Sequence, residues 1–192
     1  IDGLASGLAF LILGAFAYLY YQIHAYLFSL ISISLAGATL AFFFFNVYGK
    51  VGRLKTFMGD AGSLFLGYVI AYLAIKYQMA NEPNGFPYRE ESLLISFTLV
   101  FLPCIDVVRV AIQRKLRRRS MFEADKTHIH HRIMQIGLDM HQTLAVIITL
   151  FIVLCLINYG LYVGGLQMAY IMGIDITIYS LFSWIVELLK NE

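Results

Sequence analysis

The stretch Gln113–Arg132, QRKLRRRSMFEADKTHIHHR, interrupts a chain that is otherwise strongly apolar. It holds seven of the 14 Lys and Arg residues, and three of the five His residues fall within four of its positions. The 192-residue chain is 60% hydrophobic and 14% charged, whereas soluble domains carry about 25% charged residues. Basic loops stay on the cytoplasmic side of a membrane. The composition therefore predicts a polytopic membrane protein whose orientation this stretch determines.

The chain contains six apolar runs, four before this stretch and two after it. Each is long enough, at 1.5 Å per residue, to cross a hydrocarbon core about 30 Å thick. None of them alternates with a period of two, which a membrane-spanning strand would require. The predicted fold class is therefore all-α, a bundle of about six transmembrane helices. The runs cover residues 4–21, 25–45, 63–80, 92–112, 143–163 and 167–189.

The connections between these runs alternate in charge. The connections 46–62 and 113–142 are basic, whereas 22–24, 81–91 and 164–166 have no excess of Lys and Arg. Under the positive-inside rule, 46–62 and 113–142 are then cytoplasmic loops and both ends of the chain are cytoplasmic. We expect residues 1–192 to form one integral membrane domain.

The last run contains two acidic residues. Asp175 lies deep in the run and is expected to face protein or water rather than lipid. Glu187 lies near the cytoplasmic end, and the simplest interpretation is that its side chain reaches the interface.

Asp60 is a candidate metal ligand on the cytoplasmic side. Gly59 and Gly62 flank it and allow close approach of the backbone to a ligand. It precedes the start of the third run, and helix N-termini favour phosphate. A carboxylate beside bound phosphate suits Mg²⁺. The simpler alternative is that Asp60 caps the helix.

The histidines His128, His130 and His131 are candidates for binding diphosphate or moving protons near neutral pH. If this segment is helical, His128 and His131 share a face and His130 points away. Together with Asp125 they are also possible zinc ligands. The simplest alternative is a loop at the membrane surface that meets anionic headgroups.

Asp106 and Arg109 end the fourth run, three residues apart. At this spacing the two side chains can neutralise each other on one helix face. Alternatively, Arg109 faces a phosphate and Asp106 orients it. A nucleic-acid partner is not indicated, because the basic residues belong to a membrane chain and lack interleaved aromatic residues.

Four stretches, in order, resemble the motifs of the polyprenyl-phosphate N-acetylhexosamine-1-phosphate transferases, glycosyltransferase family 4. The last motif has the form typical of the branch that uses donors of the UDP-GlcNAc type. The resemblance covers residues 1 to about 135. The similar stretches are Asp2–Gly7 (an Asp-Gly loop), Phe57–Ser63 (FMGDxGS), Pro103–Asp106 with Arg109 (PxxDxxR) and Asp125–Arg132 (DxxHxHHR).

The resemblance implies a Mg²⁺-dependent enzyme of the bacterial cytoplasmic membrane, with Mn²⁺ as a substitute. It would transfer N-acetylhexosamine 1-phosphate from a UDP-sugar, UDP-GlcNAc first among them, to undecaprenyl phosphate and release UMP. This is the first membrane step of a cell-surface polysaccharide such as O-antigen or teichoic acid. The two substrates and the bilayer are the implied partners, and a homodimer is a further option. The implied residues are Asp60, His128, His130 and His131 for catalysis, Asp60 for the metal, and Asp2, Gly59, Asp106, Arg109 and Arg132 for substrate.

The sequence also departs from the family pattern. The N-terminal spans of the family and their paired-Asp motif are not in it, so we expect the C-terminal portion of a longer enzyme, inactive alone. One alternative is a transporter or channel with Asp106, Arg109 and Asp175 as intramembrane charges. Another is a non-catalytic scaffold for anionic lipid. Polar residues clustered at one face favour the enzyme.

Overall fold

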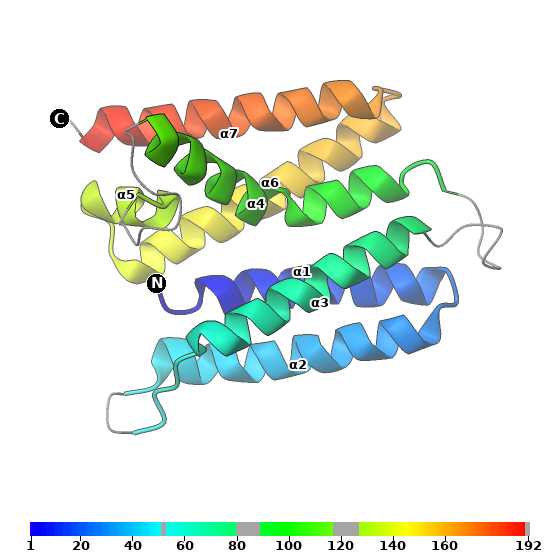
Figure 1. Cartoon of the computed structure of the whole chain (residues 1–192), viewed down its shortest axis with the longest axis horizontal. Helices are drawn as coiled ribbons and strands as arrows, with labels where there is room; N and C mark the ends of the chain where they lie inside the picture. Colours follow the sequence, from blue (N-terminus) through cyan, green and yellow to red (C-terminus); the bar gives the residue numbers. More distant parts are fainter. Residues whose placement is uncertain (51–52, 80–88, 117–126, 191–192) are drawn as a thin grey trace. The chain divides into compact units, whose positions relative to one another are not determined.

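The computed structural model describes residues 1–50, 53–79, 89–116 and 127–190 (Figure 1). All named elements among these residues are helices, which confirms the predicted all-α fold. The six long helices coincide with the six apolar runs, and a short helix lies between the fourth and the fifth of them. The helices are α1 (Leu4–Gln22), α2 (Tyr26–Tyr48), α3 (Gly59–Met79), α4 (Ser92–Leu116), α5 (Ile129–Gln135), α6 (Met140–Val163) and α7 (Met168–Lys190).

Five of the helices in the described part of the chain, α1, α2, α4, α6 and α7, are long and apolar enough to cross a membrane. Helix α3 has sufficient length but a less apolar composition. It begins at Gly59, four residues before the predicted run, and it includes Asp60 and Lys76. Its role as a sixth span therefore stays a prediction.

The chain forms two compact units, Ile1–Val100 and Phe101–Glu192, and the division falls within α4. Pro103 lies inside α4 shortly after the division, and a proline removes one backbone hydrogen bond from a helix. The prediction of one membrane domain stays a prediction.

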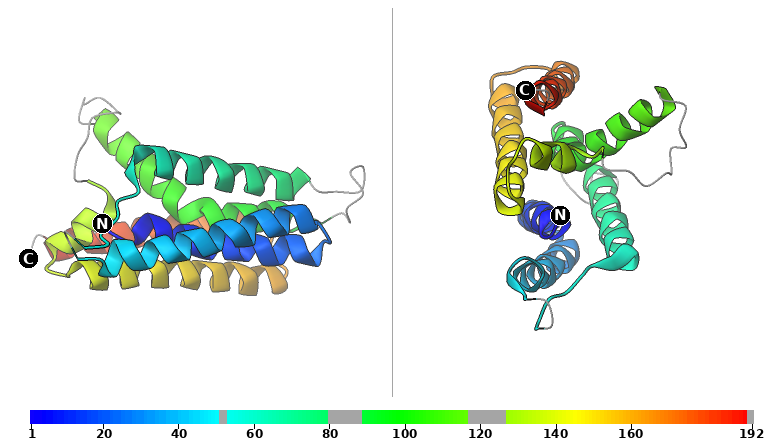
Figure 2. Two further views of the ribbon diagram at one scale, coloured as in Figure 1. Left: turned by 90° about the horizontal axis from the view of Figure 1, so that it is seen from below. Right: turned by 90° about the vertical axis from the view of Figure 1, so that its left-hand side faces the viewer.

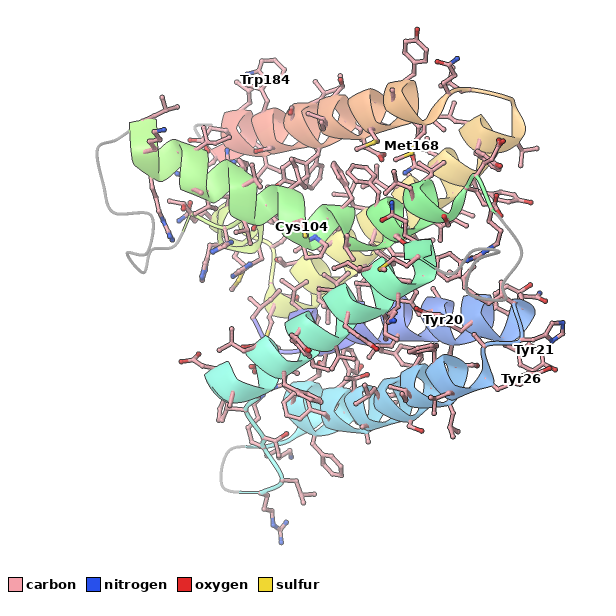
Figure 3. The ribbon with its side chains drawn as sticks, turned by 45° about the vertical axis from the view of Figure 1, so that its right-hand side comes forward. Tyr20, Tyr21, Tyr26, Cys104, Met168 and Trp184 are labelled. Atoms are coloured by element: carbon pink, nitrogen blue, oxygen red, sulfur yellow. The ribbon has the colours of Figure 1, made fainter. Side chains whose placement is uncertain are left out.

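In the first unit, α1 and α2 lie side by side in both views of Figure 2. The core of this unit is on α1, where Leu13 and Phe16 are fully buried. Hydroxyl groups join the helices by donating to backbone carbonyls, as expected where lipid offers no hydrogen bonds. The Tyr20 hydroxyl donates to the Leu73 carbonyl of α3 at 2.7 Å. At the α1–α2 turn the rings of Tyr21 and Tyr26 have centroids 5.9 Å apart (Figure 3).

In the second unit, α6 begins with a capping box formed by Asp139 and Gln142. Helices α6 and α7 contact each other, and within this pair Asp175 is fully buried. Its Oδ2 accepts a hydrogen bond of 2.8 Å from Nδ2 of Asn158 on α6. The expectation that Asp175 faces protein or water rather than lipid is confirmed.

Helix α5 lies within the segment 113–142, which the sequence analysis treats as a loop. Helix α4 extends into this segment as far as Leu116, and α6 begins at Met140. Buried Ile129 and Ile133 attach α5 to the unit, and α5 contacts both α6 and α7. The basic residues Arg117–Arg119 and the candidate zinc ligand Asp125 lie outside the described residues.

Candidate active site

Asp106 is the centre of a polar network in the second unit. Its Oδ1 accepts hydrogen bonds from Nη2 of Arg109 at 2.8 Å and from the Tyr179 hydroxyl of α7 at 2.8 Å. Its Oδ2 accepts from Nδ1 of His128 at 2.8 Å. The carboxylate also accepts from the Ile129 amide at 3.2 Å. Both oxygens of Asp106 are therefore occupied by protein donors, and the side chain is nearly buried.

The Ile129 contact explains where α5 begins. The first amides of a helix lack partners within the helix, and a nearby side-chain oxygen usually accepts from them. His128 occupies the N-cap position, but its own side chain makes no capping bond. Asp106, 23 residues earlier, supplies the oxygen instead. The end of α4 thus fixes both the start of α5 and the imidazole of His128.

The hydrogen bond to Asp106 determines the tautomer of His128. A carboxylate can only accept, so Nδ1 of His128 carries the hydrogen. In the neutral ring, Nε2 is then the unprotonated nitrogen. The His128 side chain is one-third exposed.

The three histidine rings lie together, contrary to the expectation that His130 points away from the other two. The rings of His128 and His130 are stacked with centroids 5.8 Å apart, and those of His130 and His131 are 4.2 Å apart. The helical spacing rule fails because His128 precedes the helix, with ψ of 148°. Burial, with the neighbouring His131 and His128, lowers the pKa of His130 below its ordinary value. This ring is therefore neutral near pH 7.

Arg109 is held on several sides. Besides Asp106, its guanidinium donates to the Thr127 carbonyl at 2.6 Å and to the Tyr179 hydroxyl at 3.2 Å. The pairing of Asp106 with Arg109 that the sequence suggests is formed. The arginine also ties the residue before His128 to α4, so the His segment is fixed at two consecutive positions.

Arg132 is buried and bound to α7. It forms an ion pair with Glu187, in which Nε donates to Oε2 at 2.9 Å. Nη1 donates to the Ser183 hydroxyl at 2.8 Å. The predicted role of Arg132 in substrate binding stays a prediction. These contacts give it a second role, the attachment of α5 to α7.

A cavity of about 570 Å³ lies beside this network, between α4 and α7. Its walls are mostly apolar, and Arg109, Arg132 and Glu187 supply its charged groups. Trp184, which projects outward from α7 in Figure 3, is one of the residues that line it. The apolar lining residues are Ile105, Val108, Ile112, Leu116, Ile176 and Trp184.

The first unit brings together the Asp-Gly loop and the residues before α3. Asp2 forms an ion pair with Lys55, with Nζ 2.6 Å from Oδ2. Asn46, at the end of α2, accepts from the Gly3 amide at 2.6 Å and donates to the Thr56 carbonyl at 2.7 Å. Gly3 has φ of 80°, a conformation that glycine adopts without strain. Asp2 and Gly59 both line a cavity of about 210 Å³.

Asn46 should be important for the stability of this arrangement. In Asn46→Ala the buried Gly3 amide loses its partner, and we expect a loss of about 1–3 kcal/mol in the free energy of unfolding. The midpoint of thermal unfolding of the purified protein in detergent measures this loss. Gln22→Ala, which removes an exposed amide, serves as the control. Equal midpoints for the two variants would contradict the prediction.

Asp60 lies in the first turn of α3 rather than at a cap position before it. Its side chain is exposed, and among the described residues no hydrogen bond or ion pair of its carboxylate is found. An exposed carboxylate without a partner fits a Mg²⁺ ligand, because Mg²⁺ takes one or two carboxylates and completes its shell with phosphate and water. Across the described ranges, no group of three His, Cys, Asp or Glu residues forms a metal site.

The predicted site residues thus fall into two groups. Asp2 and Gly59 come together in the first unit, which also contains Asp60. Asp106, Arg109 and the three histidines come together in the second unit. The sequence analysis missed Asn46, Lys55, Tyr179 and Ser183. On α7, the spacing of Tyr179, Ser183 and Glu187 at intervals of four is a signal of one polar helix face.

Comparison with known proteins gives several matches. Residues 1–78 match the family described as glycosyl transferase family 4. The chain is 36% identical over 129 residues to the decaprenyl-phosphate N-acetylglucosaminephosphotransferase of Mycobacterium tuberculosis. The aligned residues make up 65% of this chain and 31% of that protein. It is 33% identical over 147 residues to the probable undecaprenyl-phosphate N-acetylglucosaminyl 1-phosphate transferase of Bacillus subtilis, 77% of this chain and 38% of the relative.

A third relative is the undecaprenyl-phosphate alpha-N-acetylglucosaminyl 1-phosphate transferase of Yersinia pestis. It is 30% identical over 148 residues, which are 77% of this chain and 39% of that protein. The chain thus spans between 31% and 39% of the length of these three relatives. No solved structure matches the chain. With its five long apolar helices, the chain is a multi-pass membrane protein; its residues 1–78 match glycosyl transferase family 4, and the chain is similar to polyprenyl-phosphate N-acetylglucosamine-1-phosphate transferases.

Proposed function

We propose that this protein transfers N-acetylhexosamine 1-phosphate from a UDP-sugar to undecaprenyl phosphate and releases UMP. N-acetylglucosamine is the first candidate sugar, because the three relatives are named for it. The observation that carries the proposal is the similarity to these relatives. The Asp106 network and the exposed Asp60 at the start of α3 support it. The product would begin a cell-surface polysaccharide.

The reaction replaces one P–O bond with another. An oxygen of the lipid phosphate attacks the β-phosphorus of the UDP-sugar, the bond from this phosphorus to the bridging oxygen breaks, and UMP leaves with that oxygen. Both substrates are anions, so positioning and charge neutralisation supply most of the catalysis. Arg109, held by Asp106, adds positive charge beside the histidines. Neutral His130 contributes hydrogen bonds rather than charge.

Asp60 is the residue that would hold Mg²⁺ or, in its place, Mn²⁺. A bound divalent ion neutralises charge on a diphosphate. The proposal places Asp60 and the histidine segment on the cytoplasmic face of the bacterial cytoplasmic membrane, because the basic connections of the chain favour that side. The phosphate of the lipid acceptor also lies at the membrane interface.

The test is an assay of the full-length protein in detergent with undecaprenyl phosphate, UDP-GlcNAc and Mg²⁺. We expect UMP release and a lipid-linked sugar phosphate in equal amounts, with UMP release dependent on the lipid. UDP-GalNAc and UDP-glucose serve as alternative donors that define the sugar preference. No transfer from any of the donors, by a protein whose unfolding transition shows it to be folded, would reject the proposed function.

A further inference from the structure

Helix α7 presents one polar face toward the histidine segment. Tyr179, Ser183 and Glu187 follow each other at intervals of four residues and therefore lie on one side of the helix. Tyr179 contacts Asp106 and Arg109 of α4, whereas Ser183 and Glu187 contact Arg132 of α5. One face of α7 thus contacts both Asp106, which orients His128, and α5, which follows His128 in the chain.

Tyr179 is the member of this face that is closest to the chemistry. It is 2% exposed, and its hydroxyl both donates to Oδ1 of Asp106 and accepts from Nε of Arg109 at 3.2 Å. A phenol that bridges a carboxylate and a guanidinium satisfies both of its hydrogen-bonding roles with charged partners, and such bonds are stronger than neutral ones. The bridge fixes the rotation of the Asp106 carboxylate.

The rotation of this carboxylate matters because its other oxygen orients His128. Oδ1 is held by Tyr179 and Arg109, which leaves Oδ2 directed at Nδ1 of His128. We propose that Tyr179 is a positioning residue, which acts through Asp106 to keep His128 in the tautomer with the hydrogen on Nδ1 and with Nε2 available to substrate. The effect of Tyr179 on the rate of transfer rests on the proposed function, whereas its effect on the tautomer of His128 does not.

The variant Tyr179→Phe removes only the hydroxyl, and Tyr170→Phe is the matched control on the same helix, where the side chain is 62% exposed. The first measurement is solid-state NMR of the full-length protein labelled with ¹⁵N in the histidine rings. The ¹⁵N shift distinguishes a ring nitrogen that carries hydrogen from one that does not. The variant His128→Asn identifies the signals of His128.

We expect the unmodified protein and Tyr170→Phe to show His128 with hydrogen on Nδ1. In Tyr179→Phe the population with hydrogen on Nε2 should rise measurably. Asp106→Asn alters the other end of the bridge and is the second variant, used should Tyr179→Phe fold poorly. We expect the same rise of the population with hydrogen on Nε2 in this variant. An unchanged His128 spectrum in either folded variant would overturn the inference.

The second measurement is the rate of transfer. In Tyr179→Phe, kcat should fall about tenfold, which corresponds to about 1.4 kcal/mol in the activation barrier, while KM for both substrates changes less than about twofold. A merely structural role would instead reduce the amount of folded enzyme and leave kcat per folded molecule unchanged, which would overturn the inference. If the unmodified protein transfers nothing, the proposed function fails, and the NMR result still decides the role of Tyr179.

Discussion

The substitution Asp60→Asn is expected to reduce Mg²⁺-dependent UMP release by at least about a hundredfold, or about 2.7 kcal/mol in the barrier. Asn keeps the shape of the side chain but loses the charge that a divalent ion requires. The exposed position of Asp60 in the first turn of α3, with no ion pair found for it in the described part of the chain, indicates that its charge is free for a ligand. The measurement is UMP release by the full-length protein across a range of Mg²⁺ concentrations.

The same substitution separates metal binding from helix capping. Asn is about as good a capping residue as Asp, so a capping role would leave Asp60→Asn with nearly full activity and stability. Asp139→Asn is the matched control, because Asp139 is a capping residue at the start of α6. We expect Asp139→Asn to retain activity. If both variants behave alike, Asp60 is not the metal ligand.

The long helices could be predicted from sequence because a membrane leaves few alternatives. A segment in lipid must satisfy its backbone hydrogen bonds internally, and a run of about 20 apolar residues does so as a helix. The six predicted runs accordingly match six helices. The sequence predicts that the third helix starts at Ser63, four residues late, because Gly and Asp are typical turn residues. In the structure Gly59 begins the helix with a positive φ of 65°.

The details of the candidate site depend on contacts between distant residues, which periodicity does not reveal. The pairing of Asp106 with Arg109 spans three residues and could be predicted. The start of α5 could not, because the group that caps it lies 23 residues earlier. For the same reason the arrangement of the histidine rings differed from the helical expectation. Tyr179 lies 73 residues from Asp106, in a helix that the motifs do not cover.

Arg132 carries two competing roles, and a double-mutant cycle with Glu187 distinguishes them. If Arg132 attaches α5 to α7, Arg132→Ala and Glu187→Ala should each lower transfer activity by about tenfold, because the ion pair joins a buried guanidinium to a partly exposed carboxylate and so lies between the surface and the buried case. The double variant should then be little worse than either single variant, because one interaction is lost in all three.

If Arg132 instead binds substrate directly, the two residues should behave differently. Arg132→Ala would then raise KM or lower kcat, whereas Glu187→Ala would have only a small effect. Lys190→Ala is the matched control, because Lys190 lies 3.9 Å from Glu187 on the surface, where ion pairs contribute about 0–1 kcal/mol. The burial of Arg132 and its bonds to Ser183 and Glu187 favour the first result. Additive losses in the double variant would show that α7 does not act through Arg132.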